Sequence, residues 1–234
     1  MNAMAVLEVK NLNVTIGATN ILRNIDFSVN EGDILAVIGP NGAGKTMLLK
    51  SLMGLMEYAG NITWDKNTKI GYVPQRMEIE TDVPLTVKEF FNLRSPRPMQ
   101  KEIKKALQEV QLNESMLERG LGEISVGQRQ RILVAWAVLG HPTVLLFDEP
   151  TADIDIAGQE SIYKMLHRLH HDLNLTIILI SHDLNVVYKY AHKVLCLNKT
   201  KICYGMPNEA LNTETLLKLY GGEKAFYTHQ HEHD

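Results

Sequence analysis

The sequence predicts an α/β fold with a mostly parallel core sheet, antiparallel strands at the N-terminus and a helical insertion. Short apolar runs at 34–38, 144–147 and 176–180 are typical of fully buried strands. A helical segment at 157–173 separates the last two runs, and strand–helix–strand spacing of this kind leads to parallel pairing. We expect that helix to bury one face, made of Ile162, Met165, Leu166, Leu169 and Leu173.

The N-terminal part and the middle of the chain have other patterns. Residues 5–30 alternate between apolar and polar side chains, which predicts antiparallel strands with one solvated face. From about residue 76 to 135 the sequence predicts a mostly helical inserted subdomain, whose last helix returns the chain to the core. We therefore expect a single domain over 5–222, followed by a histidine-rich tail at 223–234.

The remaining elements are expected from local patterns and from the turn residues between them. Within the insertion we expect helical segments at 86–93, 100–110 and 113–118. Outside it we expect strands at 61–64 and 69–73, a β-hairpin from 194–197 and 201–204, and helices at 47–53 and 213–220.

The composition is that of an ordinary globular protein. The 234 residues are 45% hydrophobic and 22% charged, and no apolar stretch approaches the length of a membrane span. A net charge of −3 without a basic block argues against a nucleic-acid partner, and the N-terminus lacks the pattern of a signal peptide. We therefore expect a cytosolic protein in which Cys196 and Cys203 are free thiols.

A glycine-rich segment carries the first chemical signal. Residues 39–46 match the pattern G-x-x-x-x-G-K-[ST], directly after a predicted strand and before a predicted helix. In that context backbone N–H groups and the helix N-terminus point at phosphate oxygens. We expect Lys45 to reach the β- and γ-phosphates of a nucleoside triphosphate, and the Thr46 hydroxyl to bind Mg²⁺. The predicted nucleotide-binding residues are Gly39, Pro40, Asn41, Gly42, Ala43, Gly44, Lys45, Thr46 and Met47.

Two acidic residues follow the second buried run. Asp148 and Glu149 stand at the carboxyl end of that predicted strand, where α/β sheets bind their ligands. Asp148 is placed to hold Mg²⁺ through water, and Glu149 to take a proton from an attacking water. Alone, the pair also fits a solvated strand end. Together with the phosphate loop it predicts nucleotide hydrolysis.

A polar segment lies one helix upstream of the acidic pair. Ser125 is well placed as a helix N-cap, and Gly127 lets another backbone approach closely. By itself the segment fits a cap followed by a flexible turn. Its position in the chain, after the phosphate loop and before Asp148, also favours a functional role.

The chain resembles an ATP-binding-cassette ATPase from about residue 5 to 222. The resemblance rests on six motifs in order, namely 39–46, Gln75, 125–128, 144–150, 151–155 and His182. It implies a P-loop NTPase fold with a RecA-like core, and ATP and Mg²⁺ as cofactors. It also implies that two copies sandwich two ATP molecules head to tail.

The resemblance implies roles for single residues as well. The signature segment Ser125, Val126, Gly127 and Gln128 would contact the γ-phosphate of the ATP bound by the opposite subunit. Gln75 would sense Mg²⁺ and the γ-phosphate, His182 would hold that phosphate from the same side as Glu149, and Asp155 would cross the dimer seam. The implied catalytic set is therefore Glu149, His182 and Gln75, and the magnesium set is Thr46, Gln75 and Asp148.

Three residues depart from the family's pattern. Val126 stands where the family has Gly, Ile16 where an aromatic side chain commonly stacks on adenine, and Met47 where a second Thr is common. We expect ATP contact to survive through Ser125 and Gly127, base selectivity to be looser, and Met47 to point away from the magnesium.

Within the family, the chain is most similar to ATPase subunits of bacterial zinc and manganese importers. Residues 70–76, Asp82, 84–87, 204–211 and 220–221 carry that similarity. It implies a separate membrane permease, an extracytoplasmic solute-binding protein and a position on the cytoplasmic face of the cell membrane.

The C-terminal tail fits the same subgroup. His229, His231 and His233 alternate, so an extended chain would place three imidazoles on one side, where they could bind Zn²⁺. A disordered polar terminus fits the same residues.

Other functions stay open at the level of the sequence. The chain could be an importer ATPase for iron chelates or another small solute, or a non-transport cassette such as an iron–sulfur assembly ATPase. It could also be a nucleotide-binding regulator that barely hydrolyses, although Glu149 argues against this. The transported solute, the permease and the direction of transport depend on other chains.

Overall fold

A computed structural model describes residues 5–75, 84–94, 96–149 and 154–221 of the chain. Several sequence predictions lie outside these described residues. They are those for Arg76 and Asp82, for 150–153, and for the tail histidines His229, His231 and His233.

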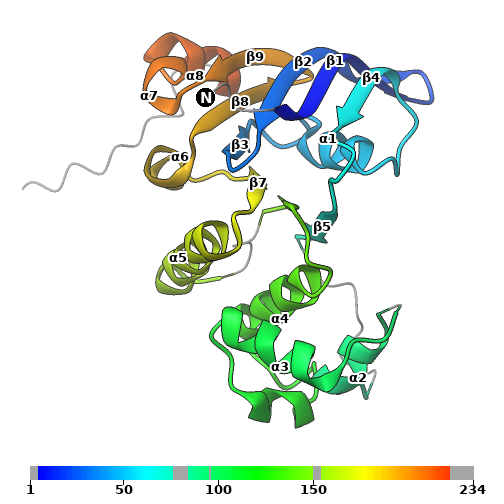
Figure 1. The fold of residues 1–234 in the computed structure, drawn as a ribbon. Coiled ribbons are helices and arrows are strands. Elements are labelled where there is room, and N and C mark those ends of the chain that lie inside the picture. Colours follow the sequence, from blue (N-terminus) through cyan, green and yellow to red (C-terminus); the bar gives the residue numbers. More distant parts are fainter. Residues whose placement is uncertain (1–4, 76–83, 95, 150–153, 222–234) are drawn as a thin grey trace, which may run out of the picture.

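A six-stranded sheet forms the centre of the molecule, with the strand order β5-β6-β7-β3-β8-β9 (Figure 1). The first five strands of that order pair in parallel, and the last two form an antiparallel hairpin. The predicted α/β fold with a mostly parallel sheet is therefore confirmed. The strands are β3 (Ile34–Ile38), β5 (Ile70–Val73), β6 (Val144–Phe147), β7 (Thr176–Ile180), β8 (Lys193–Asn198) and β9 (Thr200–Gly205).

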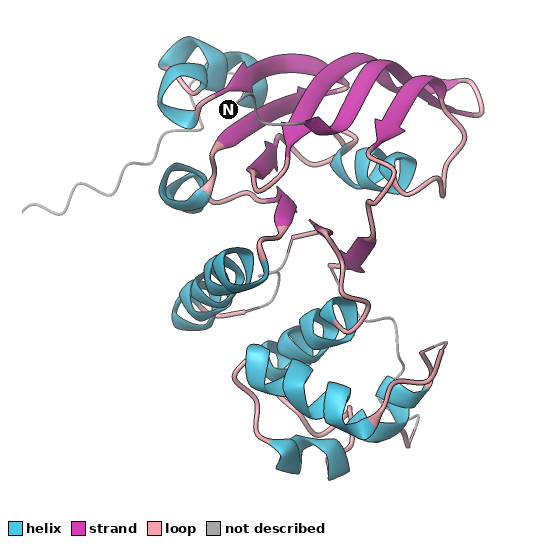
Figure 2. Ribbon diagram, in the orientation of Figure 1, coloured by secondary structure: helices cyan, strands magenta, loops and turns pink. Residues whose placement is uncertain are grey.

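A second, antiparallel sheet covers one face of the first, as Figure 2 shows. It has the order β2-β1-β4, with β1 spanning Ala5–Ile16, β2 spanning Thr19–Asn30 and β4 spanning Ala59–Trp64. Helix α1 (Lys45–Leu52) contributes three leucines to the core that these sheets share. The alternation in the first 30 residues thus correctly predicted two paired strands.

The pleat of β3 divides the rest of the core. Leu35 and Val37 join the cluster under the antiparallel sheet, whereas Ala36 and Ile38 join a cluster on the other face. Three C-terminal helices cover that second cluster. They are α6 (Leu184–Tyr190), α7 (Pro207–Ala210) and α8 (Thr213–Tyr220), of which α6 and α7 were not predicted.

A helical lobe lies at the β5 end of the core sheet, away from the antiparallel sheet (Figure 1). We use this name for α2 (Val87–Asn92), α3 (Gln100–Glu109), the 3₁₀ helix η1 (Glu114–Glu118) and α4 (Val126–Val138). The expected helical segment at 100–110 is confirmed, and its apolar residues Ile103, Leu107 and Val110 are all buried. The lobe shares one apolar cluster with α5 (Ile156–Leu173) and with strands β6 and β7.

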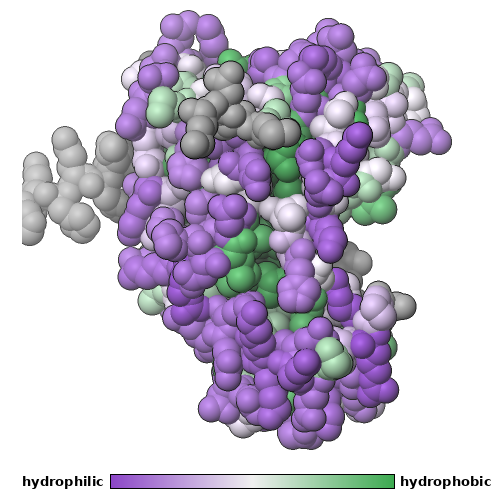
Figure 3. Space-filling model, viewed as in Figure 1, coloured by the Kyte–Doolittle hydropathy of each residue, from purple (hydrophilic) through white to green (hydrophobic). Residues whose placement is uncertain are grey.

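The prediction that Leu173 is buried in the core is wrong. Leu173 is 37% exposed, whereas Ile162, Met165, Leu166 and Leu169 are buried as expected. Leu173 is the last residue of the helix, so it extends past the packed part of α5 and lines a cavity instead. Figure 3 shows apolar surface in the hollow between α4 and α5.

The expectation of two free thiols is also wrong. Cys196 and Cys203 form a disulfide, with their Cα atoms 4.7 Å apart. They lie directly opposite each other on β8 and β9, so the register of the hairpin brings the two side chains together.

None of the helices in the described part of the chain is long and apolar enough to span a membrane.

Candidate nucleotide-binding site

The glycine-rich loop joins β3 to α1, as the sequence predicts. β3 ends at Ile38, and α1 begins at Lys45 with Gly44 as its N-cap. The loop borders a cavity of about 540 Å³, a size that suits a nucleotide-sized ligand. The cavity is lined by Ile16, Ile21, Asn41, Gly42, Ala43, Gly44, Lys45, Thr46, Met47, Gln75 and Glu149.

The turn of the β8–β9 hairpin supports this loop from behind. A Cβ atom at Gly39 would lie only 2.0 Å from the backbone oxygen of Leu197, so glycine is required there by close approach. The Lys199 N–H donates to the Ala43 carbonyl (3.0 Å), and the Lys199 carbonyl accepts from the Arg23 N–H (2.8 Å). The loop is therefore held between the core sheet and β2.

Lys45 provides a positive charge under the loop. Its side chain is only 6% exposed, and its ammonium group donates to the carbonyls of Gly39 (2.9 Å) and Pro40 (3.1 Å). Burial lowers the pKa of Lys45, while the nearby charges of Glu149 and Asp148 act in the opposite direction. The ammonium lies 3.9 Å from Glu149 Oε1, between the loop and the acidic residue.

Asp148 lies at the floor of the site and is 2% exposed. Its Oδ1 atom accepts a hydrogen bond from the Thr46 hydroxyl (3.3 Å). Burial raises the pKa of Asp148, and the Thr46 hydrogen bond partly offsets this effect. The chain thus brings together two of the three residues predicted to bind magnesium.

Sequence reasoning missed Tyr72, which also belongs to this floor. Burial raises the pKa of Tyr72 to about 12, and Asp148 adds to the rise as a neighbouring charge and hydrogen-bond partner. Tyr72 therefore stays a protonated donor across the physiological pH range. The available signal was its place on β5, three residues before Gln75, on the strand that pairs with β6.

Glu149 is held by two residues from neighbouring strand ends. Gln75 Nε2 donates to Glu149 Oε2 (2.6 Å), and His182 Nε2 lies 2.5 Å from Oε1. The backbone of Glu149 has a φ of 46°, which is uncommon for a residue other than glycine and is often found at functional sites. Two of the residues predicted to be catalytic, Gln75 and His182, are therefore both in direct contact with the third, Glu149.

The signature segment is not part of this cavity. Ser125 caps α4 as predicted, in a capping box in which Gln128 reaches back to the Ser125 N–H. Val126 is 46% exposed, and Asp155 caps α5 by accepting from the Gly158 N–H (3.3 Å). Among the described residues, the cavity lining does not include any of these signature residues or Asp155.

Comparison with known proteins shows the family of the chain. Residues 22–152, more than half of the chain, match the family described as "ABC transporter". The protein named "Zinc import ATP-binding protein ZnuC" of Haemophilus influenzae is 35% identical, with 98% of this chain and 87% of that protein covered. The "Probable metal transport system ATP-binding protein" of Thermotoga maritima is 38% identical, with 93% and 91% covered.

Solved structures have the same fold. One structure of an ABC transporter in an inward-facing conformation is 30% identical to this chain, with a TM-score of 0.83 over 92% of this chain and 89% of that one. The ATP-binding cassette MJ1267 in its ADP conformation is 22% identical, with a TM-score of 0.81 over 94% of this chain and all of that one. The family match, the relatives and the phosphate-loop geometry agree: this chain belongs to the ABC transporter family, as one of its ATP-binding ATPase subunits.

Proposed function

We propose that this chain hydrolyses ATP to drive the import of a divalent metal ion, zinc or manganese, through a separate membrane permease. The observation that carries the hydrolysis is the contact of Gln75 and His182 with the Glu149 carboxylate, next to Lys45. The names of the relatives, which refer to zinc import and metal transport, support the choice of cargo.

The phosphate loop and Lys45 bind the nucleotide in this proposal. The ammonium of Lys45 exchanges its two loop carbonyls for the β- and γ-phosphate oxygens, which are stronger acceptors because they are charged. Ile16 and Ile21 form an aliphatic wall of the same cavity, so the base makes apolar contact there without aromatic stacking.

Thr46, Gln75 and Asp148 fit a magnesium site. All three offer oxygen atoms, which are the ligands that Mg²⁺ prefers, and Thr46 and Asp148 already lie within hydrogen-bond distance. Bound Mg²⁺ would neutralise charge on the phosphate oxygens. Tyr72 would keep the Asp148 carboxylate oriented by donating its hydroxyl proton.

Glu149 acts as the general base on the attacking water. Each of its oxygens is in contact with one of these two side chains, Gln75 or His182, and each keeps a lone pair that can accept a hydrogen bond from the attacking water. When nucleotide and Mg²⁺ are bound, His182 would also have the γ-phosphate as a partner, and Gln75 would have the metal. Glu149 can then accept the water proton.

A second copy of the chain completes the site. Ser125, Gly127 and Gln128 lie at the exposed start of α4, where backbone N–H groups can reach a phosphate bound to another subunit. Asp155 crosses the seam between the two subunits. Val126 replaces a glycine of the family's motif and adds bulk beside this contact without removing Ser125 or Gly127.

The other partners and the location follow from the same proposal. We place the chain on the cytoplasmic face of the cell membrane, bound to its permease, with an extracytoplasmic solute-binding protein acting indirectly. We further propose that residues 5–222 are one domain with a helical subdomain at about 76–135, and that the tail at 223–234 has a regulatory role at most.

The first test replaces Glu149 by Gln. We expect turnover to fall by about 10²–10⁴-fold while ATP binding is retained, because the amide cannot accept the water proton. The matched control is Glu160→Gln on α5, an exposed carboxylate paired with Lys164, which should leave turnover unchanged. Full turnover by Glu149→Gln would refute the general-base role.

The second test identifies the proteins that remain bound when this chain is isolated from its native membranes. A multi-span permease, encoded beside a metal-binding extracytoplasmic protein, is the expected result. Uptake of radioactive zinc and manganese by cells lacking this chain would then separate the two metals. A soluble iron–sulfur scaffold in place of the permease would overturn the transport function and leave the ATPase function standing.

A further inference from the structure

Two carbonyl groups at the end of α3 have no partner within their own helix. The N–H groups of Val110, Gln111 and Leu112 bond back to earlier carbonyls, which ends the helix. The carbonyls of Glu109 and Val110 extend beyond that point and carry the partial negative charge of a helix C-terminus. Partly buried backbone acceptors of this kind are satisfied by donors from outside the helix.

Two arginines supply those donors from two different helices. Arg168 of α5 donates through Nη2 to the Glu109 carbonyl. Arg131 of α4 donates through Nη1 to the Val110 carbonyl (2.6 Å) and through Nη2 to the Ser161 hydroxyl of α5 (2.8 Å). We call Arg131 and Arg168 the arginine clamp, because together they join α3, α4 and α5.

The clamp holds two like charges close together. Burial lowers the pKa of the Arg131 guanidinium, and the positive charge of Arg168 lowers it further. This repulsion is offset by the helix-end carbonyls, which both guanidinium groups approach. The planar guanidinium can direct donors to two helices at once in a fixed geometry, which the ammonium of lysine cannot do.

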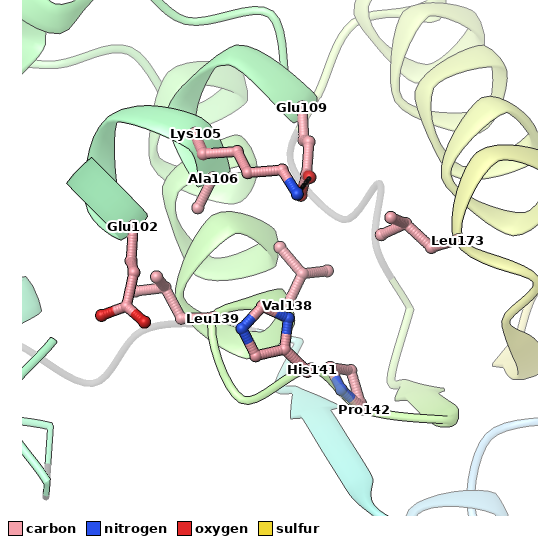
Figure 4. Close-up of a pocket in the computed structure, with 9 residues that line it drawn as sticks. All are labelled: Glu102, Lys105, Ala106, Glu109, Val138, Leu139, His141, Pro142 and Leu173. Carbon is pink, nitrogen blue, oxygen red and sulfur yellow. Dashed lines mark ion pairs between the residues drawn. The ribbon is translucent and has the colours of Figure 1, made fainter. Parts of the chain in front are cut away.

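A cavity borders Glu109, whose carbonyl accepts from Arg168, so close packing is incomplete near the clamp. Its volume is about 280 Å³, and it lies between α3, the end of α4 and the end of α5. In Figure 4, Leu173 of α5 faces Val138 of α4 across this cavity, and Glu109 points toward Lys105 of its own helix. Apolar contact is non-directional, so directed hydrogen bonds are needed to set the angle of the lobe.

The clamp is close to both segments proposed to meet a second subunit. Arg131 lies six residues after Ser125, and its partner Ser161 lies six residues after Asp155. Six helical residues span about 9 Å, so a tilt of about 10° at the clamp would move either N-cap by about 1.5 Å. Misplacement of about 1 Å is enough to cost up to 100-fold in a site that depends on position.

We propose that Arg131 and Arg168 are positioning residues, which hold the signature end of α4 and the Asp155 end of α5 in register for ATP-driven dimerisation. The inference rests on the proposed function, because it needs the two-subunit site. It assigns no contact with the nucleotide to either arginine. Their effect is therefore on the assembly of the dimer and not on nucleotide binding by the single chain.

The test uses the full-length protein with Glu149→Gln, so that ATP is bound but not consumed. Arg131→Lys is added, and ATP-dependent dimerisation is measured by analytical ultracentrifugation. We expect the dimer dissociation constant to rise by about tenfold or more. The affinity of the monomer for a fluorescent ATP analogue should stay within about twofold of the parent, since the phosphate loop is untouched.

Arg94→Lys is the matched control. Arg94 is also a partly buried arginine whose burial lowers its pKa, but it bonds within the lobe, donating to the Trp136 carbonyl (2.8 Å) and stacking on the Trp136 ring. The Arg94→Lys substitution should lower the thermal stability of the protein without weakening the dimer. Ser161→Ala removes only one bond of the clamp, so it should fold and weaken the dimer by a smaller factor.

The outcomes separate the two proposals. Equal dimerisation by the parent and by Arg131→Lys, or an equal loss in Arg94→Lys, would overturn the positioning role. A parallel loss of monomer nucleotide affinity would also overturn it. If the parent protein itself forms no ATP-dependent dimer, both the clamp's role and the two-subunit site fail, while the membrane pull-down still tests the transport function.

Discussion

Replacing Gly39 by Ala tests whether the hairpin or the nucleotide imposes glycine at the start of the phosphate loop. The added Cβ would lie 2.0 Å from the Leu197 carbonyl oxygen, a backbone atom that cannot move without shifting β8. Overpacking of this kind costs about 1–3 kcal/mol, and the φ of 156° adds about 1–3 kcal/mol of backbone strain for alanine. We therefore expect Gly39→Ala to lose roughly 2–6 kcal/mol of folding free energy.

The assay is urea unfolding of the nucleotide-free protein, followed by circular dichroism. Gly42→Ala is the control, because Gly42 is in the same loop with a φ of 76° but a Cβ atom added there would meet no other atom within 4 Å. The Gly42→Ala variant should lose only about 1–2 kcal/mol of unfolding free energy, which is the cost of a left-handed backbone conformation for alanine. Equal losses in the two variants would refute the close-approach argument, since only Gly39 faces the hairpin.

Three further predictions follow from the site and its surroundings. Tyr72→Phe should raise the Mg²⁺ concentration needed for half-maximal ATPase activity by roughly 3- to 10-fold, because Asp148 loses a donor; an unchanged requirement would exclude Tyr72 from the site. Reducing the Cys196–Cys203 disulfide, which closes a loop with a sequence separation of 7, should cost roughly 2 kcal/mol of unfolding free energy; two titratable thiols in the unreduced, denatured protein would contradict the pairing. Ser125→Ala should lose about 1 kcal/mol and Ser125→Asp much less, because only the latter keeps a capping oxygen; equal stability of the two variants would argue against the cap.

The sequence predicted the parts of the site that depend on local pattern. The strand before the phosphate loop, the helix after it and the cap at Ser125 each follow from residues next to one another. The contact between Gln75, Glu149 and His182 could be expected because all three follow strand ends, which parallel pairing brings to one edge of a sheet.

The parts that sequence reasoning missed depend on register and on distant contacts. Cys196 and Cys203 are opposite each other only in the register that the irregular β8–β9 hairpin adopts, whereas the prediction considered the redox compartment alone. Leu173 fits the apolar face of α5 by its spacing, but the helix ends there and the neighbouring α3 leaves a cavity. Arg131 binds a helix end about 20 residues away, for which no spacing rule exists.

An amide in the turn of the β8–β9 hairpin can be used to measure how well the phosphate loop is ordered. The Lys199 N–H is bonded to the Ala43 carbonyl of the phosphate loop, yet Lys199 does not line the nucleotide cavity. Hydrogen exchange at this amide therefore depends on how firmly the loop is held, without interference from direct ligand contact. Slower exchange of the Lys199 amide on addition of nucleotide would report that the phosphate loop becomes ordered, without a probe attached to the protein.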